Sequence, residues 1–170
     1  TSAYIPFGAM MVSDKIANHF DDIPFVLGLT CSGHPVACAA ALENISVIQE
    51  SNLVENAAEM GKYLEVEVEK LMQKHPSIGD FRNTGLLGCI ELVKDRETKE
   101  PVTPWNASHG EMEPTLRMAA KMKELGMFTF VRWNWIFIAP PLIITKEQID
   151  EGLKIISQVI EIADEYYTGS

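Results

Sequence analysis

The segment from Asn52 to Lys74 limits the fold most, because it predicts a single long amphipathic helix. Its apolar side chains recur every three or four residues and form one stripe, while most charged side chains lie off that stripe. The stripe comprises Leu53, Ala57, Met60, Leu64, Val68 and Leu71. The His75-Pro76 pair ends the helix, since proline disfavours helical backbone angles in the residue before it. Shorter elements follow, so we expect a domain boundary between residues 50 and 75.

The other segments mix short strands with helices. The expected strands are residues 9–12, residues 85–93, and two strands within 127–138 that turn back at Trp133-Asn134. The expected helices are residues 14–20, 35–49, 114–125 and a last helix that begins with a capping box of Thr145 and Gln148. This mixture predicts an α/β or α+β fold.

The composition argues against several kinds of partner. The formal net charge is −10 with only four arginines, so no basic stripe is available to neutralise a nucleic acid backbone. The three cysteines form no Cys-x-x-Cys pair, which argues against a metal site and predicts reduced thiols in a cytoplasmic protein. The longest apolar stretches, 85–93 and 135–144, are too short to span a bilayer, and we expect neither a membrane segment nor an export signal.

A loop rich in glycine and hydroxyl groups, Gly28 to Pro35, directly precedes the helix at 35–49. Backbone N–H groups at a helix N-terminus attract phosphate, and the hydroxyls of Thr30 and Ser32 add two possible donors. The simpler interpretation is that Thr30 or Ser32 only caps the helix, because capping loops vastly outnumber phosphate sites. The loop by itself leaves both interpretations open.

Two arginines are candidates to bind an acidic substrate group, because a guanidinium forks onto carboxylate or sulfonate oxygens. Arg82 is more simply explained as part of a surface ion pair. Arg132 is the stronger candidate, since it lies in an aromatic stretch beside Trp133 and Trp135, where an exposed charge is less expected.

Four segments together resemble the C-terminal part of the class III, or omega, aminotransferases, which depend on pyridoxal phosphate (PLP). They are residues 1–9 (TSAYIPFGA), 28–35 (GLTCSGHP), 82–88 (RNTGLLG) and 139–145 (APPLIIT). Their order and spacing extend the resemblance over nearly the whole chain. The chain looks closest to the taurine:pyruvate and other omega-amino acid:pyruvate enzymes.

The resemblance implies an α/β fold that is the C-terminal portion of the PLP fold type I architecture. Residues 1–50 would end the large PLP-binding domain, and residues 51–170 would form the interdomain helix and the small C-terminal α+β domain. The resemblance also implies a homodimer that shares its cofactor site across the interface. Thr30 would donate its hydroxyl to the phosphate of PLP held mainly by the neighbouring subunit, with Leu29 as a second cofactor-binding residue. Arg132 would bind the substrate.

The implied reaction transfers an amino group from an omega-amino acid or amine, such as taurine, to pyruvate or a similar keto acid. The Schiff-base lysine of the family aligns about three residues ahead of Thr1, so we expect no catalytic residue in this chain and no activity from it alone. One alternative is a non-catalytic assembly or ligand-binding module. Another is a different class III PLP enzyme, such as an aminomutase or a decarboxylase.

Overall fold

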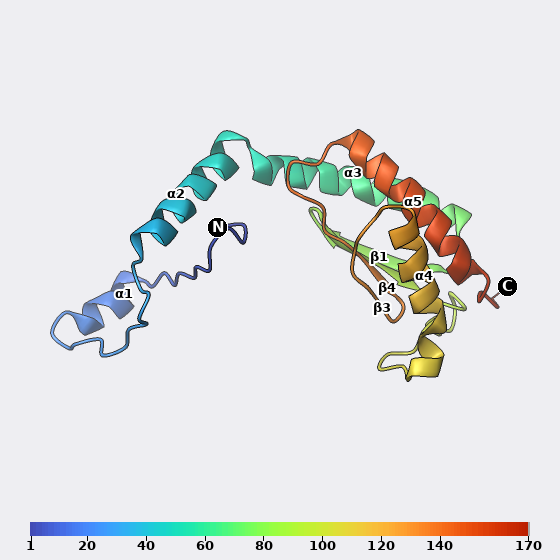
Figure 1. Ribbon diagram of the computed structural model, residues 1–170, viewed down its shortest axis with the longest axis horizontal. Coiled ribbons are helices and arrows are strands. Elements are labelled where there is room, and N and C mark those ends of the chain that lie inside the picture. Colours follow the sequence, from blue (N-terminus) through green and yellow to red (C-terminus); the bar gives the residue numbers. More distant parts are fainter. Residues whose placement is uncertain (170) are drawn as a thin grey trace. The chain divides into compact units, whose positions relative to one another are not determined.

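The computed structural model describes residues 1–169 and divides the chain into two compact units, Thr1–Asn52 and a second unit that begins at Leu53. The first unit holds the short helix α1 (Asp14–Ala17), a single 3-10 turn η1 (Asn18–Phe20) and the long helix α2 (Pro35–Glu50) (Figure 1). Pro35 opens α2, where its missing N–H group costs no hydrogen bond. The helices expected at 14–20 and 35–49 are thereby confirmed.

The strand expected at residues 9–12 is wrong. Residues 9–12 have no regular secondary structure, and their side chains are exposed. A strand needs a neighbour that accepts its backbone hydrogen bonds, and every strand in the described part of the chain belongs to the second unit. An apolar run alone therefore did not predict a strand here, because no neighbouring strand among the described residues is available to pair with it.

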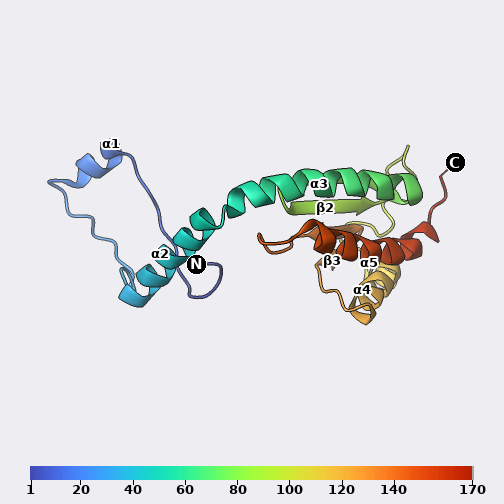
Figure 2. The same ribbon diagram turned by 90° about the horizontal axis from the view of Figure 1, so that it is seen from above.

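The second unit packs three helices against one antiparallel sheet (Figures 1 and 2). The strands lie in the order β1-β2-β4-β3. Their bounds are β1 (Ile78–Thr84), β2 (Leu87–Leu92), β3 (Val131–Arg132) and β4 (Trp135–Ile138). The helices are α3 (Leu53–Lys74), α4 (Glu113–Glu124), which follows the 3-10 turn η2 (His109–Met112), and α5 (Lys146–Asp164). Alternate residues of β2 and β4 enter the same buried cluster as the inner faces of these helices.

Several local signals of the second unit are confirmed. Gly126 follows α4 with a φ of +82°, the left-handed backbone that a helix C-terminus favours for glycine. The Thr145 side chain accepts from the backbone N–H of Gln148, which completes the capping box of α5. β1 was missed, because its sequence, IGDFRNT, is largely polar and is held by pairing with β2 rather than by apolar alternation.

Helix α3 rests directly on the turn between β1 and β2. A Cβ atom added at Gly61 would lie only 2.5 Å from the carbonyl oxygen of Gly85. The Asn83 side chain donates to the carbonyl oxygens of both glycines, at 3.0 Å each. This contact of backbone with backbone fixes the position of α3 along the sheet.

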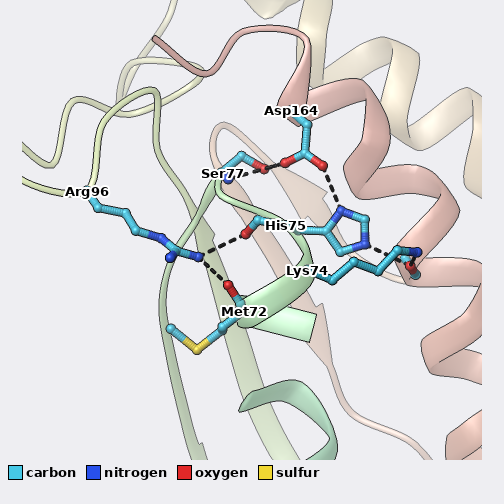
Figure 3. A network of polar contacts seen from close by, with 7 residues as sticks. Met72, Lys74, His75, Ser77, Arg96 and Asp164 are labelled. Atoms are coloured by element: carbon cyan, nitrogen blue, oxygen red, sulfur yellow. Dashed lines mark hydrogen bonds and ion pairs between the residues drawn. The ribbon is translucent and has the colours of Figure 1, made fainter. Parts of the chain in front are cut away.

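A buried polar network joins the end of α3 to the end of α5 (Figure 3). His75 lies 2.6 Å from Asp164 through Nδ1 and 2.7 Å from the Ser157 hydroxyl through Nε2. Lys74 can only donate, so its bond to Ser157 leaves the Ser157 hydrogen free for His75 Nε2, and His75 Nδ1–H then donates to Asp164. Asp164 also accepts from the N–H and the hydroxyl of Ser77. The side chains of Ser157, His75, Asp164 and Ser77 therefore form one continuous chain of hydrogen bonds.

Arg96 closes the same region from the other side (Figure 3). Its guanidinium donates to the backbone carbonyls of Met72, His75 and Ile78. Carbonyls at a helix C-terminus lack partners within the helix, and a cation there also interacts favourably with the helix dipole. Arg96 thus supplies donors to the carbonyls at the end of α3.

The network predicts a large loss of stability when Asp164 is replaced. Asp164→Ala leaves the donors of His75 and Ser77 without an acceptor, which we expect to lower the free energy of unfolding by about 2–4 kcal/mol. Urea unfolding at neutral pH measures this change. Glu161→Ala is the matched control, because Glu161 is an exposed acid on the same helix. Equal stability of the two variants would contradict a structural role for the network.

Candidate functional site

The loop from Gly28 to His34 presents free hydrogen-bond donors. Within residues 1–169, neither the hydroxyl nor the backbone N–H of Thr30 makes a hydrogen bond, and the Cys31 N–H is likewise unbonded. The loop keeps its form through two bonds between Leu29 and Ser32: the Leu29 N–H donates to the Ser32 hydroxyl at 3.2 Å, and the Ser32 N–H donates back to the Leu29 carbonyl at 3.0 Å. Thr30, the tip of this turn, is exposed.

The simpler interpretation of this loop, a helix cap, is wrong. His34 occupies the capping position of α2, and no side chain caps the helix there. The hydroxyl of Ser32 is used within the loop, and that of Thr30 is not used by the described residues at all. The helix therefore begins with unpaired N–H groups, next to a threonine hydroxyl with no structural task.

A pocket of about 460 Å³ lies beside the loop. It is lined by Ile5, Pro6, Phe7, Gly8, Leu29, Cys31, Ser32, Gly33, His34 and Ala37. Thr30 is not among its lining residues, whereas Leu29 is, although its side chain is largely exposed. Thr30 therefore lies outside the pocket of its own chain, at a place where its hydroxyl is open to a ligand from outside.

The loop fits the phosphate group of the implied PLP. Phosphate oxygens only accept hydrogen bonds, and the loop offers the Thr30 hydroxyl, two free N–H groups and the positive end of the 16-residue helix α2. No acidic side chain lies between Gly28 and Ala37 to repel an anion. These residues can bind a phosphate but include no lysine that would form a Schiff base with PLP.

Arg132 ends strand β3, next to a two-residue turn formed by Trp133 and Asn134. Its guanidinium carbon lies 4.0 Å from the centre of the Trp133 ring, so the two planar groups are in cation–π contact. The side chain is exposed and pairs with no carboxylate of residues 1–169. Arg132 is therefore a cation held by an aromatic ring and free to bind an anion.

The turn beside Arg132 is firmly anchored. Trp133 has a φ of +52°, and its carbonyl accepts from the buried Thr115 hydroxyl at 2.6 Å. Asn134 is buried, and its amide donates to the Leu92 carbonyl at 3.2 Å. Sequence reasoning placed the turn correctly but missed both anchors. The absence of glycine from so tight a hairpin was the available signal, since such turns favour glycine where φ is positive.

Arg82 is engaged in ion pairs on the exposed face of the sheet. It contacts Asp80 at 3.0 Å and Glu91 at 3.3 Å, as the simpler interpretation of this residue predicted. The small pocket beside it, about 260 Å³, also exposes Cys89. Burial, with a smaller contribution from Glu91, raises the pKa of the Cys89 thiol, so the thiolate that would be reactive is disfavoured. This pocket carries no evident chemistry.

The buried network of Ser157, His75 and Asp164 has the order of a nucleophile, a base and an orienting acid. However, Ser157 lies inside α5, where backbone N–H groups are used by the helix and cannot stabilise an oxyanion. Its hydroxyl also accepts from Lys74. We therefore assign this network to stability rather than to catalysis.

The predicted site residues lie in different units. Thr30 and Leu29 belong to the first unit, and Arg132 belongs to the second. Among residues 1–169, no group of three or more His, Cys, Asp or Glu side chains could hold a metal ion. None of the helices described in these residues combines the length and the apolar character needed to cross a membrane.

Comparisons with known proteins agree on one family. Residues 1–160 match the sequence profile of the family described as aminotransferase class-III. A putrescine–pyruvate aminotransferase of Pseudomonas aeruginosa is 34% identical over 95% of this chain and 34% of its own. A leucine/methionine racemase of Thermococcus litoralis is 35% identical over 86% of this chain and 31% of its own.

A solved structure extends the likeness to the fold. The taurine:2-oxoglutarate aminotransferase of Bifidobacterium kashiwanohense, solved with PLP and glutamate, superposes with a TM-score of 0.81 at 36% identity. The match covers 91% of this chain and 34% of that one. The chain thus spans about a third of the length of these relatives.

The anchored hairpin predicts a specific effect at Thr115. Thr115→Val keeps the shape of the side chain but removes its hydrogen bonds to the Trp133 carbonyl and to the Thr103 hydroxyl, so we expect a loss of about 1–2 kcal/mol in the free energy of unfolding. Near-ultraviolet circular dichroism should change as well, because the Trp133 ring lies between those of Trp105 and Trp135. Thr115→Ser keeps the hydroxyl and should restore both signals. Failure of serine to restore them would point to packing instead.

Proposed function

Since this chain belongs to the class III aminotransferase family, we propose that the protein transfers amino groups with PLP as its cofactor. Its fold is the C-terminal portion of the PLP fold type I architecture. Residues 1–50 would be the end of the large PLP-binding domain, and residues 51–170 the interdomain helix and the small domain. The main support is the family match along residues 1–160, together with the free hydrogen-bond donors of the loop at Thr30.

The proposed amino donor is an omega-amino acid or amine, such as taurine, and the acceptor is pyruvate or a similar keto acid. The names of two relatives support the proposed donor and the proposed acceptor separately. One is a taurine:2-oxoglutarate aminotransferase, and another is a putrescine–pyruvate aminotransferase. We also propose a cytoplasmic location, in keeping with three cysteines that all remain unpaired.

When bound, PLP supplies the electron sink that allows an amino group to leave the donor. Thr30 would hold the cofactor in place by donating its hydroxyl to a phosphate oxygen, and the free N–H groups of the loop would add further donors. Leu29 would shield this contact from water, since its long apolar side chain lies exposed beside Thr30. Arg132 would orient the substrate by binding its carboxylate or sulfonate group.

We propose that the protein is a homodimer and that Thr30 serves the PLP of the partner subunit. Thr30 lies outside the pocket of its own chain, which suits a ligand that comes from another subunit. The first unit also exposes many large apolar side chains, which mark a protein interface when they are gathered in one region. They include Tyr4, Met10, Met11, Val26, Leu27 and Leu29.

A second candidate is another reaction of the same cofactor. It is favoured by one observation, the 35% identity to a leucine/methionine racemase. The two functions differ in their need for a keto acid: without one, a transaminase converts only one amine per bound PLP and then stops, whereas a racemase inverts its amino acid continuously.

The proposed reaction predicts where PLP is attached. In the intact enzyme, borohydride reduction should fix PLP to a lysine outside residues 1–170, and peptide mapping identifies that lysine. Alanine should form from taurine or another amine only when pyruvate is present, and a polypeptide of residues 1–170 alone should form none. PLP fixed to Lys15, the first lysine of this chain, would contradict the assignment.

The phosphate contact predicts a selective effect at Thr30. Thr30→Val removes one hydrogen bond to a charged group, worth about 1.5–3 kcal/mol, so PLP affinity of the intact enzyme should fall roughly ten- to a hundredfold. Titration of the apoenzyme with PLP, followed by absorbance, measures the affinity. Thr30→Ser keeps the hydroxyl and should bind PLP nearly as well as the unmodified enzyme. Unchanged affinity of Thr30→Val would exclude the contact.

A further inference from the structure

The contact between Arg132 and Trp133 uses only one part of the guanidinium. The guanidinium carbon of Arg132 lies over the Trp133 ring, 4.0 Å from the ring centre, so the ring contacts the cation through its π face. The N–H groups of a guanidinium point outward along its edges, and none of those of Arg132 bonds to a residue within 1–169. The ring thus restrains the cation without using the donors that recognise an acid group.

The ring that restrains Arg132 is itself in an unusual conformation. Trp133 has a φ of +52° at the first central position of its turn, where glycine is the common residue. A bulky side chain in this region of backbone angles is strained. The strain is held by the bond from Thr115 to the Trp133 carbonyl and by the burial of Asn134. Position 133 therefore holds a tryptophan at a positive φ that glycine would adopt with less strain.

Two further tryptophans lie next to Trp133. Its ring centre lies 5.6 Å from that of Trp105 and 5.2 Å from that of Trp135. Trp135 is the residue paired with Arg132 across the two strands. The nearby Glu91 is engaged with Arg82 and Asn134, so it does not neutralise Arg132. The result is a fixed cation beside an aromatic wall.

We propose that Trp133 is a positioning residue that selects substrates bearing a carboxylate or sulfonate. It holds the guanidinium of Arg132 over its ring, so that the side chain is already restrained when its free N–H groups meet the acid group. Amines without an acid group gain nothing from this arrangement. This inference rests on the proposed function and names the substrate class of the same site.

The test compares two kinds of donor in the intact enzyme. Trp133→Gly removes the ring but suits the positive φ, so the hairpin should still fold. We expect the KM for taurine and β-alanine to rise about tenfold, with kcat changed less than twofold and the KM for propylamine unchanged. Trp133→Tyr should restore the lower KM, and Trp105→Leu, which alters the same aromatic group away from Arg132, should not shift KM selectively.

A separate binding measurement keeps the result independent of catalysis. Calorimetric titration with propane-1-sulfonate, which carries no amine, should show weaker binding to Trp133→Gly than to the unmodified protein by about tenfold. If the unmodified enzyme transfers no amino group, the proposed function fails, and this titration still decides the role of Trp133. Equal sulfonate affinity in both proteins, or equal rises in KM for acidic and acid-free amines, would overturn the inference.

Discussion

The backbone contact between Gly61 and Gly85 is the constraint on which the second unit depends. A side chain at Gly61 would overlap the Gly85 carbonyl, so α3 can lie this close to the sheet only because residue 61 is glycine. The Asn83 amide then bonds to both carbonyls and fixes the distance. Since α3 also carries the buried stripe from Leu53 to Val68, its position determines where the core, and with it α5, can form.

From this fixed helix the structure extends in two ways. At the far end of α3, the His75 network and Arg96 bind the helix terminus to α5 and β1 through a partly buried chain of hydrogen bonds. At the edge of the sheet, the hairpin of β3 and β4 carries Arg132 next to its turn. Thr115 and Asn134, two buried polar residues, hold this turn through hydrogen bonds. These two hydrogen-bonded residues thereby hold the turn that carries the exposed side chain of Arg132.

Much of the fold could be predicted from the sequence, because periodic apolar residues and capping residues indicate the long helices. Thr145 and Gln148 are one example, and Pro35 is another. Strands were harder to predict. The apolar run at 9–12 forms none, while the polar segment Ile78–Thr84 forms one, since pairing with a neighbour decides the outcome. The candidate site was predictable as residue types, Thr30 and Arg132, but the strained φ of Trp133 and its anchors depend on tertiary contacts between distant segments.

The two candidate regions follow opposite physical strategies. The loop at Thr30 uses no side chain to cap α2 and leaves its donors free for the anion that we propose it binds. The hairpin at Arg132 is already complete, because its cation is restrained before any ligand binds. A cofactor that stays bound orders its loop a single time, and the order persists through many turnovers. A substrate is replaced in each turnover, so the loss of side-chain entropy on binding would recur each time. Free donors therefore suit the cofactor phosphate, and a preformed cation suits the substrate.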